Sequence, residues 1–210
     1  MVRTAILVSG GGTNLQAIIA AKLFGEIRNC NIVAVISSNQ NAYALDRARA
    51  AGIDASVVDV TTFPTKRTFN TALLQKLKDL DVELVVLAGF MQILQRPIVK
   101  EYENRIMNVH PSLIPSFCGD GCYGLQVHQM ALDYGVKVSG ATVHFVTEDV
   151  DAGPIILQKA VDILPNDTAK SLQQRIMEQA EWDILPRAMD LFCRGKIRVE
   201  GRRVIIDEEA

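Results

Sequence analysis

Short apolar runs that alternate with amphipathic segments constrain the fold of this chain more than any other feature. Runs typical of buried strands occupy residues 4–9, 31–38, 54–60, 83–90 and 105–110. Segments with apolar residues at helical spacing separate several of them, at residues 14–25, 42–52 and 69–80. Strands that alternate with helices of this length form parallel sheets covered by helices on both faces. The first half therefore predicts a doubly wound, mostly parallel α/β sheet.

The second half has a different pattern. Residues 139–146 and 153–163 are strand-like runs around an acidic loop, and they predict an antiparallel extension of the sheet. A long helix is expected from about Thr168 to Phe192, kinked at Pro186 because proline cannot donate a backbone hydrogen bond. Residues 196–206 predict a closing hairpin around Gly201. No repeat or linker interrupts the chain, so we expect one domain over residues 1–210.

Composition argues against several classes of partner. The 210 residues are 49% apolar, enough for a sizeable core in one soluble domain. A net charge of −2 provides no basic field for nucleic acid. No apolar run reaches the roughly 20 residues that a membrane helix needs, and the apolar stretch at the N-terminus is too short for a signal peptide. We therefore expect a cytoplasmic protein with reduced thiols.

Two of the four cysteines invite a metal interpretation. Cys118 and Cys122 are four residues apart, but no second Cys or His pair lies at zinc-ligand spacing. We expect no metal site and no disulfide framework.

A glycine-rich stretch, "SGGGTN", lies between the first strand and the first helix, from Ser9 to Asn14. Glycines let the backbone approach an anion, and a helix N-terminus offers free N–H groups. The stretch is no Walker A loop, and Leu15 stands where the dinucleotide fingerprint needs its third glycine. It predicts a site for a single substrate phosphate, although a tight turn with a helix cap would also explain it.

Asn108 and His110 stand two residues apart at the end of a predicted strand. Residues at this spacing project from the same face, so both side chains would meet one ligand. Asn can donate to an oxygen that becomes negative, and His can move a proton near neutral pH. On spacing alone, a pair that caps the turn before Pro111 is an equal alternative.

An acidic loop follows the strand-like run that ends near residue 146. Asp151 near His110 would raise the imidazole pKa and orient the ring, but Glu148 and Asp149 are rivals that spacing does not separate. A solvated loop tip is the alternative for all three. We expect His128 and His144 to be mainly structural.

The segment "LAGFMQIL", from Leu87 to Leu94, stays apolar beyond the predicted strand end. Such a loop can line a pocket for a flat, largely apolar ligand. Burial under the last helix would explain it as well.

Taken together, "SGGGTNLQAI", "LAGFMQIL", "NVHPSLIPSF" and "GATVHFVTEDVDAGPIILQ" resemble the phosphoribosylglycinamide formyltransferases, the folate-dependent glycinamide ribonucleotide transformylases of purine synthesis. The match runs in order from Ala5 to about Pro186. The resemblance implies a Rossmann-like formyltransferase fold. It also implies transfer of a formyl group from the co-substrate 10-formyltetrahydrofolate to the amine of glycinamide ribonucleotide, with no metal, by a monomer or homodimer.

The same resemblance assigns residues. It implies catalysis by Asn108, His110 and Asp151: the amine attacks directly, and Asn108 and protonated His110 stabilise the tetrahedral oxyanion. Asp151 would keep His110 charged and oriented. The implied substrate-binding residues are Gly12, Thr13 and Asn14 for the phosphate and Glu181 for the ribose hydroxyls. The implied folate-binding residues are Met91, Gln92, Ile93, Leu94, Asn108 and Lys66, where Arg67 is an alternative to Lys66.

The sequence also departs from some relatives. Gln92 replaces an Arg, Thr13 replaces a Ser, and the loop around Cys118 and Cys122 is longer. Three other functions were weighed. A formyltetrahydrofolate hydrolase would carry an extra N-terminal domain, and a methionyl-tRNA formyltransferase would carry an RNA-binding C-terminal domain. A non-catalytic nucleotide-binding module would leave Asn108, His110 and Asp151 without a shared purpose.

Overall fold

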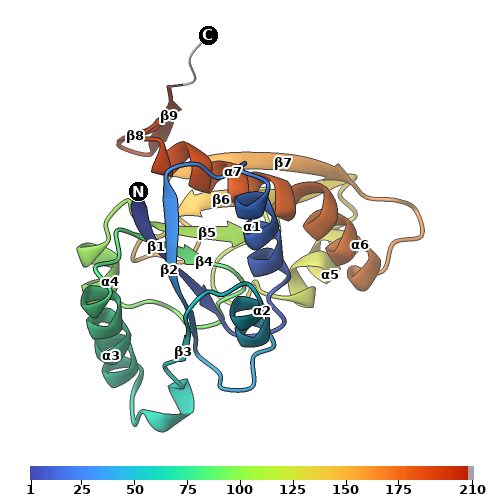
Figure 1. Cartoon of the computed structure of the whole chain (residues 1–210). Coiled ribbons are helices and arrows are strands. Elements are labelled where there is room, and N and C mark those ends of the chain that lie inside the picture. Colours follow the sequence, from blue (N-terminus) through green and yellow to red (C-terminus); the bar gives the residue numbers. More distant parts are fainter. Residues whose placement is uncertain (208–210) are drawn as a thin grey trace.

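The structure is a computed structural model that describes residues 1–207, and its centre is one nine-stranded sheet (Figure 1). The strand order is β3-β2-β1-β4-β5-β6-β7-β9-β8. The strands are β1 (Val2–Val8), β2 (Cys30–Ser37), β3 (Ala55–Val57), β4 (Leu84–Leu87), β5 (Ile106–His110), β6 (Val138–Phe145), β7 (Ile155–Asp162), β8 (Ile197–Glu200) and β9 (Arg203–Ile206). β1 to β5 are parallel, and β6 and β7 are antiparallel additions. The expected mixed sheet is confirmed.

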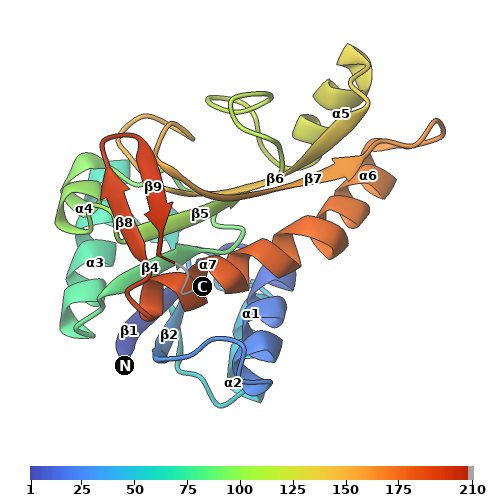
Figure 2. The same ribbon diagram turned by 90° about the horizontal axis from the view of Figure 1, so that it is seen from above.

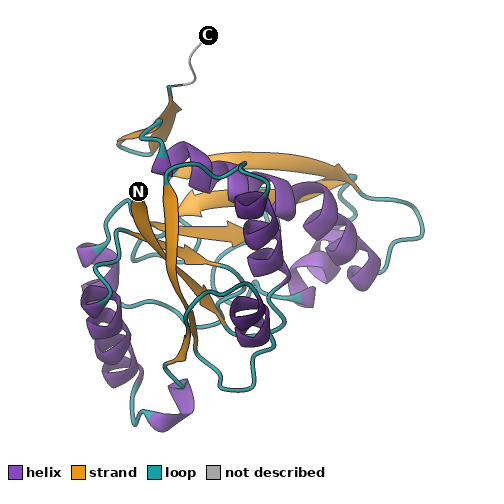
Figure 3. Cartoon of the chain, viewed as in Figure 1, coloured by secondary structure: helices purple, strands orange, loops and turns teal. Residues whose placement is uncertain are grey.

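Helices cover both faces of this sheet (Figure 3). They are α1 (Thr13–Leu23), α2 (Ala44–Ala50), α3 (Lys66–Asp79), α4 (Arg96–Glu101), α5 (Leu125–Tyr134), α6 (Ala169–Ile176) and α7 (Trp182–Cys193), with a 3-10 turn at Val60–Thr62. Alternate residues of one strand pack against the helices on opposite faces of the sheet. Ile6 of β1 packs in the core under α1, α2, α6 and α7, whereas Leu7 packs in the core under α3 and α4. A run of fully buried residues such as β4 is therefore apolar throughout.

The long helix differs from the expectation. A π-helical turn, Met177–Glu181, separates α6 from α7, and Pro186 lies inside α7. Because proline has no N–H group, the carbonyl four residues upstream, at Trp182, loses its helical partner. The observed departure from α geometry lies upstream of both residues, in the turn Met177–Glu181. Figure 2 shows this composite helix crossing one face of the sheet beside α1.

The remaining expectations about the C-terminal half fit the structure. β6 and β7 pair antiparallel from Val138↔Asp162 to His144↔Ile155. β8 and β9 form the hairpin around Gly201, whose φ is +61°. The extent of a single domain over residues 1–210 stays a prediction, and residues 208–210 lie outside the described part.

The sheet order places a topological switch between β1 and β4. The chain leaves β1 toward β2 and β3, then returns to the other side of β1 to form β4 and β5. Ligands of open α/β sheets bind at the carboxyl ends of the strands at such a switch. The glycine-rich stretch, the loop of residues 88–95 and His110 all lie at these strand ends.

Candidate active site

Asn108 and His110 lie in the second half of β5, a strand held on both sides. Asn108 is level with Leu87 of β4 and with His144 of β6, and His110 is level with Thr142. His110 is 4% exposed, and Asn108 is partly exposed. The shared face expected from their spacing brings both side chains to the same cluster, described below.

Asp151 is the carboxylate that reaches His110. Its Oδ2 lies 3.4 Å from His110 Nδ1, and its Oδ1 lies 3.6 Å from His144 Nε2. The backbone of Asp151 is left-handed, with φ of +53°, a conformation that Asp tolerates better than most residues. Glu148 pairs instead with Arg96 at 3.1 Å, and Asp149 is exposed. The geometry therefore selects Asp151 from the three acids.

His144 also lies in this cluster, beside Asn108 and Asp151, and the expectation that its role is mainly structural stays a prediction. Its Nδ1 lies 2.9 Å from the Phe145 carbonyl, which can only accept, so Nδ1 carries the proton. Its Nε2 is then free to accept from Asn108 Nδ2 at 3.3 Å. One side of the Asn108 amide is thereby fixed, with the Nδ2 donor directed toward His144.

His128 is buried, and both its ring nitrogens lack hydrogen-bond partners within the described residues. Burial, and to a smaller extent the nearby His110, lower the pKa of His128 to about 4. A neutral, buried imidazole fits the structural role expected for this residue.

Opposing effects act on the pKa of His110. Burial lowers the pKa of His110, and the opposing effects of Asp151 and of the Phe117 carbonyl do not make up for it. Asp151 does raise this pKa, as expected from the sequence, but desolvation of the ring is the larger effect and lowers the pKa overall. Burial also raises the pKa of Asp151, but contacts with His144, His110 and Gly119 bring it below its usual value. Asp151 is thus a charged partner beside a ring that loses its proton readily.

The loop after β5 folds back over His110 and Asp151. The Phe117 carbonyl lies 2.9 Å from His110 Nε2, and the Gly119 N–H donates to Asp151 Oδ2 at 3.0 Å. Cys118, between them, donates its thiol to the Pro115 carbonyl, and burial raises the pKa of that thiol. The backbone of this loop therefore forms hydrogen bonds with both His110 and Asp151.

The glycine-rich stretch and the π-helical turn come together on the other side of the switch. Gly12 precedes α1 with φ of +74°, and a Cβ there would lie 2.6 Å from Ala44 Cβ. Asn14 Nδ2 donates to Glu181 Oε2 at 2.7 Å, and Thr13 contacts Met177 at 3.7 Å. Burial raises the pKa of Glu181 to about 7 despite the hydrogen bond from Asn14. Residues 167 positions apart thus form one site.

The apolar loop after β4 is partly open to solvent. Met91 and Ile93 are 54% and 55% exposed, whereas Leu94 is buried in the core under α3 and α4. Gln92 is half-buried. The Met91 N–H donates to Ser9 Oγ at 2.9 Å, which ties this loop to the glycine-rich stretch. Burial under the last helix therefore does not account for Met91 and Ile93.

Lys66 and Arg67 are exposed at the start of α3. Within residues 1–207 neither side chain forms an ion pair, so the structure does not choose between them.

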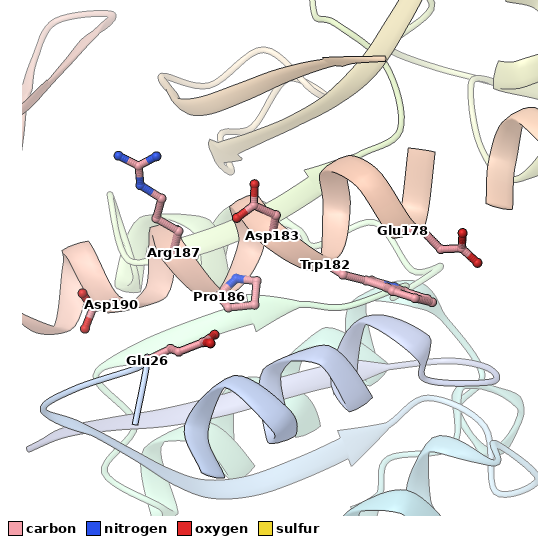
Figure 4. Close-up of a pocket in the computed structure, with 7 residues that line it drawn as sticks. All are labelled: Glu26, Glu178, Trp182, Asp183, Pro186, Arg187 and Asp190. Carbon is pink, nitrogen blue, oxygen red and sulfur yellow. The ribbon is translucent and has the colours of Figure 1, made fainter. Parts of the chain in front are cut away.

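Two open cavities lie away from this cluster. One, of about 480 Å³, is lined by Arg96, Pro97, Lys100 and Glu101. The other, of about 410 Å³, lies along α7 and is lined by Glu26, Glu178, Trp182, Asp183, Pro186, Arg187 and Asp190 (Figure 4). Neither includes Asn108, His110 or Asp151, over which the loop carrying Phe117 and Gly119 is packed.

Two further observations concern metals and membranes. In the part of the chain that is described, no three His, Cys, Asp or Glu side chains gather in a group that could hold a metal ion. None of the helices described here combines the length and apolar character required to cross a membrane.

Comparison with known proteins places this geometry in a family. Residues 2–189 match the formyl transferase family. A phosphoribosylglycinamide formyltransferase of Haemophilus influenzae is 38% identical over 100% of this chain and 96% of its own length. The solved structure of glycinamide ribonucleotide transformylase 1 from Symbiobacterium toebii is 46% identical with a TM-score of 0.92, over 98% of this chain and 94% of that chain.

A longer relative is also similar. A trifunctional purine biosynthetic protein of Bos taurus is 42% identical over 99% of this chain, which spans only 20% of that protein. The match over nearly the full length of the bacterial relative, together with the family match, is decisive: the chain belongs to the formyl transferase family and, within it, to the phosphoribosylglycinamide formyltransferases, enzymes of purine biosynthesis.

Proposed function

We propose that the chain transfers the formyl group of 10-formyltetrahydrofolate to the glycinamide amine of phosphoribosylglycinamide. The products are formylglycinamide ribonucleotide and tetrahydrofolate. The observation that carries the proposal is the cluster of Asn108, His110 and Asp151 at the carboxyl end of β5, on the same edge of the sheet as the glycine-rich stretch that follows β1. A donor amide, an imidazole and a carboxylate meet there, one strand away from the topological switch between β1 and β4.

The proposed chemistry is direct attack of the amine on the formyl carbon. The resulting tetrahedral oxyanion needs donors, which Asn108 and the protonated His110 supply. His110 then donates a proton to the folate nitrogen as the bond from that nitrogen to the formyl carbon breaks, and the proton that the attacking amine loses restores the charged ring. Asp151, 3.4 Å from Nδ1, opposes the loss of charge that burial imposes on the ring. No covalent enzyme intermediate and no metal take part.

The substrate is proposed to lie between α1 and the π-helical turn. Gly12, Thr13 and Asn14 offer the backbone N–H groups of the first turn of α1 to the phosphate. Glu181, whose Oε2 accepts from Asn14, lies where it can accept from ribose hydroxyls. The amine end of the substrate is proposed to extend from there to His110.

The co-substrate is proposed to lie against residues 91–94. Exposed Met91 and Ile93 provide apolar contact for flat rings, and Gln92 and Asn108 provide polar groups beside them. Lys66, or Arg67 next to it, is assigned to the carboxylates of the folate tail. The Phe117 carbonyl is hydrogen-bonded to His110 Nε2. The loop after β5 therefore has to move away before that nitrogen can bind a ligand.

The wider setting follows from the same proposal. Both ligands are small molecules, and neither nucleic acid nor a membrane takes part. The enzyme acts in the cytoplasm as one domain, as a monomer or homodimer.

The test is an initial-rate assay with both ligands, in which tetrahydrofolate formation must depend on the ribonucleotide. His110→Ala is expected to lose most of the rate, on the order of 10²-fold or more, while keeping the fold. Formate release without the amine acceptor would instead favour a hydrolase. Wild-type activity in His110→Ala would remove the chemical basis of the proposal.

A further inference from the structure

Asn14 and Glu181 form a buried polar pair whose partners are incomplete. Asn14 is 8% exposed and Glu181 is 6% exposed. Their one hydrogen bond runs from Asn14 Nδ2 to Glu181 Oε2 at 2.7 Å. Within residues 1–207, Asn14 Oδ1 is buried without a partner, and Glu181 Oε1 accepts no hydrogen bond. Buried polar atoms are rarely left unsatisfied, so Asn14 Oδ1 indicates a place for a donor of a ligand, and Glu181 Oε1 offers a second acceptor on the same residue pair.

The backbone explains why the pair meets. Asn14 is in the first turn of α1, directly after the left-handed Gly12. Glu181 closes the π-helical turn between α6 and α7, and such turns often occur at functional sites because they re-aim one side chain. The pair thus joins the glycine-rich stretch to the long helix.

Glu181 has no other described partner that would keep it charged. Burial raises its pKa to about 7, and the hydrogen bond from Asn14 is the only contact that lowers it. Several charged groups on the surrounding segments are engaged with other partners. They are Asp183 of α7 with Lys159 of β7, Arg175 of α6 with Asp167, Glu178 of the π-helical turn with Gln174, and Lys22 of α1 with the Ile27 carbonyl.

We propose that Asn14 is a positioning residue that acts through Glu181. Its side-chain amide holds Oε2 and turns Oε1 toward the ligand, so that Oε1 and Asn14 Oδ1 form a pair of acceptors suited to adjacent hydroxyl groups. This inference rests on the proposed function for the identity of the ligand, a ribonucleotide. It assigns the Asn14 side chain a task separate from phosphate binding, which the backbone of the same turn performs.

The proposal implies that loss of the Asn14 side chain weakens ribonucleotide binding by an amount that depends on pH. Without Asn14, the pKa of Glu181 rises above its present value of about 7. Less of the carboxylate is then charged at neutral pH, and the charged form returns only in more alkaline solution. If the substitution only distorted the loop, the loss of affinity for the ribonucleotide would be the same at every pH.

The experiment compares Asn14→Leu, which keeps the side-chain volume but removes the donor, with Gln16→Leu as a matched control. Gln16 is an exposed amide on the same turn that accepts from Arg47 and does not contact Glu181. The KM for the ribonucleotide and kcat are measured from pH 6 to 9. Asn14→Leu is expected to raise KM about 10-fold at pH 7, with little change in kcat and a smaller deficit at high pH. Asn14→Ser, which is too short to reach Glu181, repeats the comparison if the Leu variant is poorly folded.

A second readout needs no substrate. Carbon-13 NMR of the side-chain carboxyls follows the titration of Glu181 in the free protein. The proposal expects its inflection to move to higher pH in Asn14→Leu and to stay in place in Gln16→Leu. An unchanged inflection in Asn14→Leu, or a KM increase that is equal at every pH, overturns it. Absence of formyl transfer by the wild-type protein would refute the proposed function, whereas the titration decides the role of Asn14 independently.

Discussion

Replacing Asp151 by Asn tests how the site keeps His110 able to donate a proton. Asn tolerates the left-handed backbone of this position, φ of +53°, and its oxygen can still accept from the Gly119 N–H. The substitution therefore removes the charge and largely keeps the shape. His110 is 4% exposed, so little solvent screens its interaction with a carboxylate 3.4 Å away.

The magnitude follows from the loss of that charge. A neighbouring opposite charge moves a pKa by about 1–3 units, and about 2 units correspond to roughly 3 kcal/mol. Burial already lowers the pKa of His110, and the variant loses the main opposing effect. The imidazolium form is then confined to lower pH and falls about 100-fold at pH values above the pKa. We expect kcat to fall by about the same factor, with the pH limb that reports His110 displaced to lower pH.

The assay is formyl transfer as a function of pH, with circular dichroism to verify the fold. Glu148→Gln is the matched control, because Glu148 lies in the same loop but pairs with Arg96 at the surface. Its rate is expected to stay within about two-fold of the wild type, since exposed ion pairs contribute little. If Asp151→Asn kept more than half of kcat, or if its pH limb did not move, the assigned role of the carboxylate would be refuted.

Two other outcomes concern the glycine-rich stretch and the cysteines. Gly12→Ala should lower the free energy of unfolding by about 3 kcal/mol, because the new Cβ would lie 2.6 Å from Ala44 Cβ at a φ of +74°. Gly25→Ala, with φ of +77° and open space, should cost only about 1 kcal/mol in the same denaturant titration, and equal costs would contradict the steric reasoning. The double variant Cys118→Ser, Cys122→Ser should keep near-normal activity, and elemental analysis should find no zinc in either protein. Loss of activity together with loss of bound zinc would contradict the absence of a metal site.

Local patterns predicted much of the fold. Continuous apolar runs such as β4 are buried on both faces, so their character as parallel strands is visible in the sequence. The π-helical turn at Met177–Glu181 was not predicted, because its residues have ordinary helical spacing. The short α4 was also not predicted: six residues after a proposed pocket loop show too little periodicity.

The site was predictable where chemistry and spacing agree. Asn108 and His110 share a face because strand residues alternate with a period of two. His144 was assigned to structure because its place opposite Asn108 depends on the register of β5 with β6, which local pattern does not determine. The overall lowering of the His110 pKa was not predicted for a related reason: the sequence identifies a charged partner that raises the pKa but not the depth of burial that outweighs it.

The measurement that tests the central claim most directly follows the formyl carbon itself. The wild-type protein is given 10-formyltetrahydrofolate labelled with carbon-13 in the formyl group, with and without glycinamide ribonucleotide, and the label is traced by NMR. The account predicts that the label appears in the formamide of the ribonucleotide product, one equivalent for each tetrahydrofolate formed. Label that appears as free formate at the same rate in both samples would contradict it.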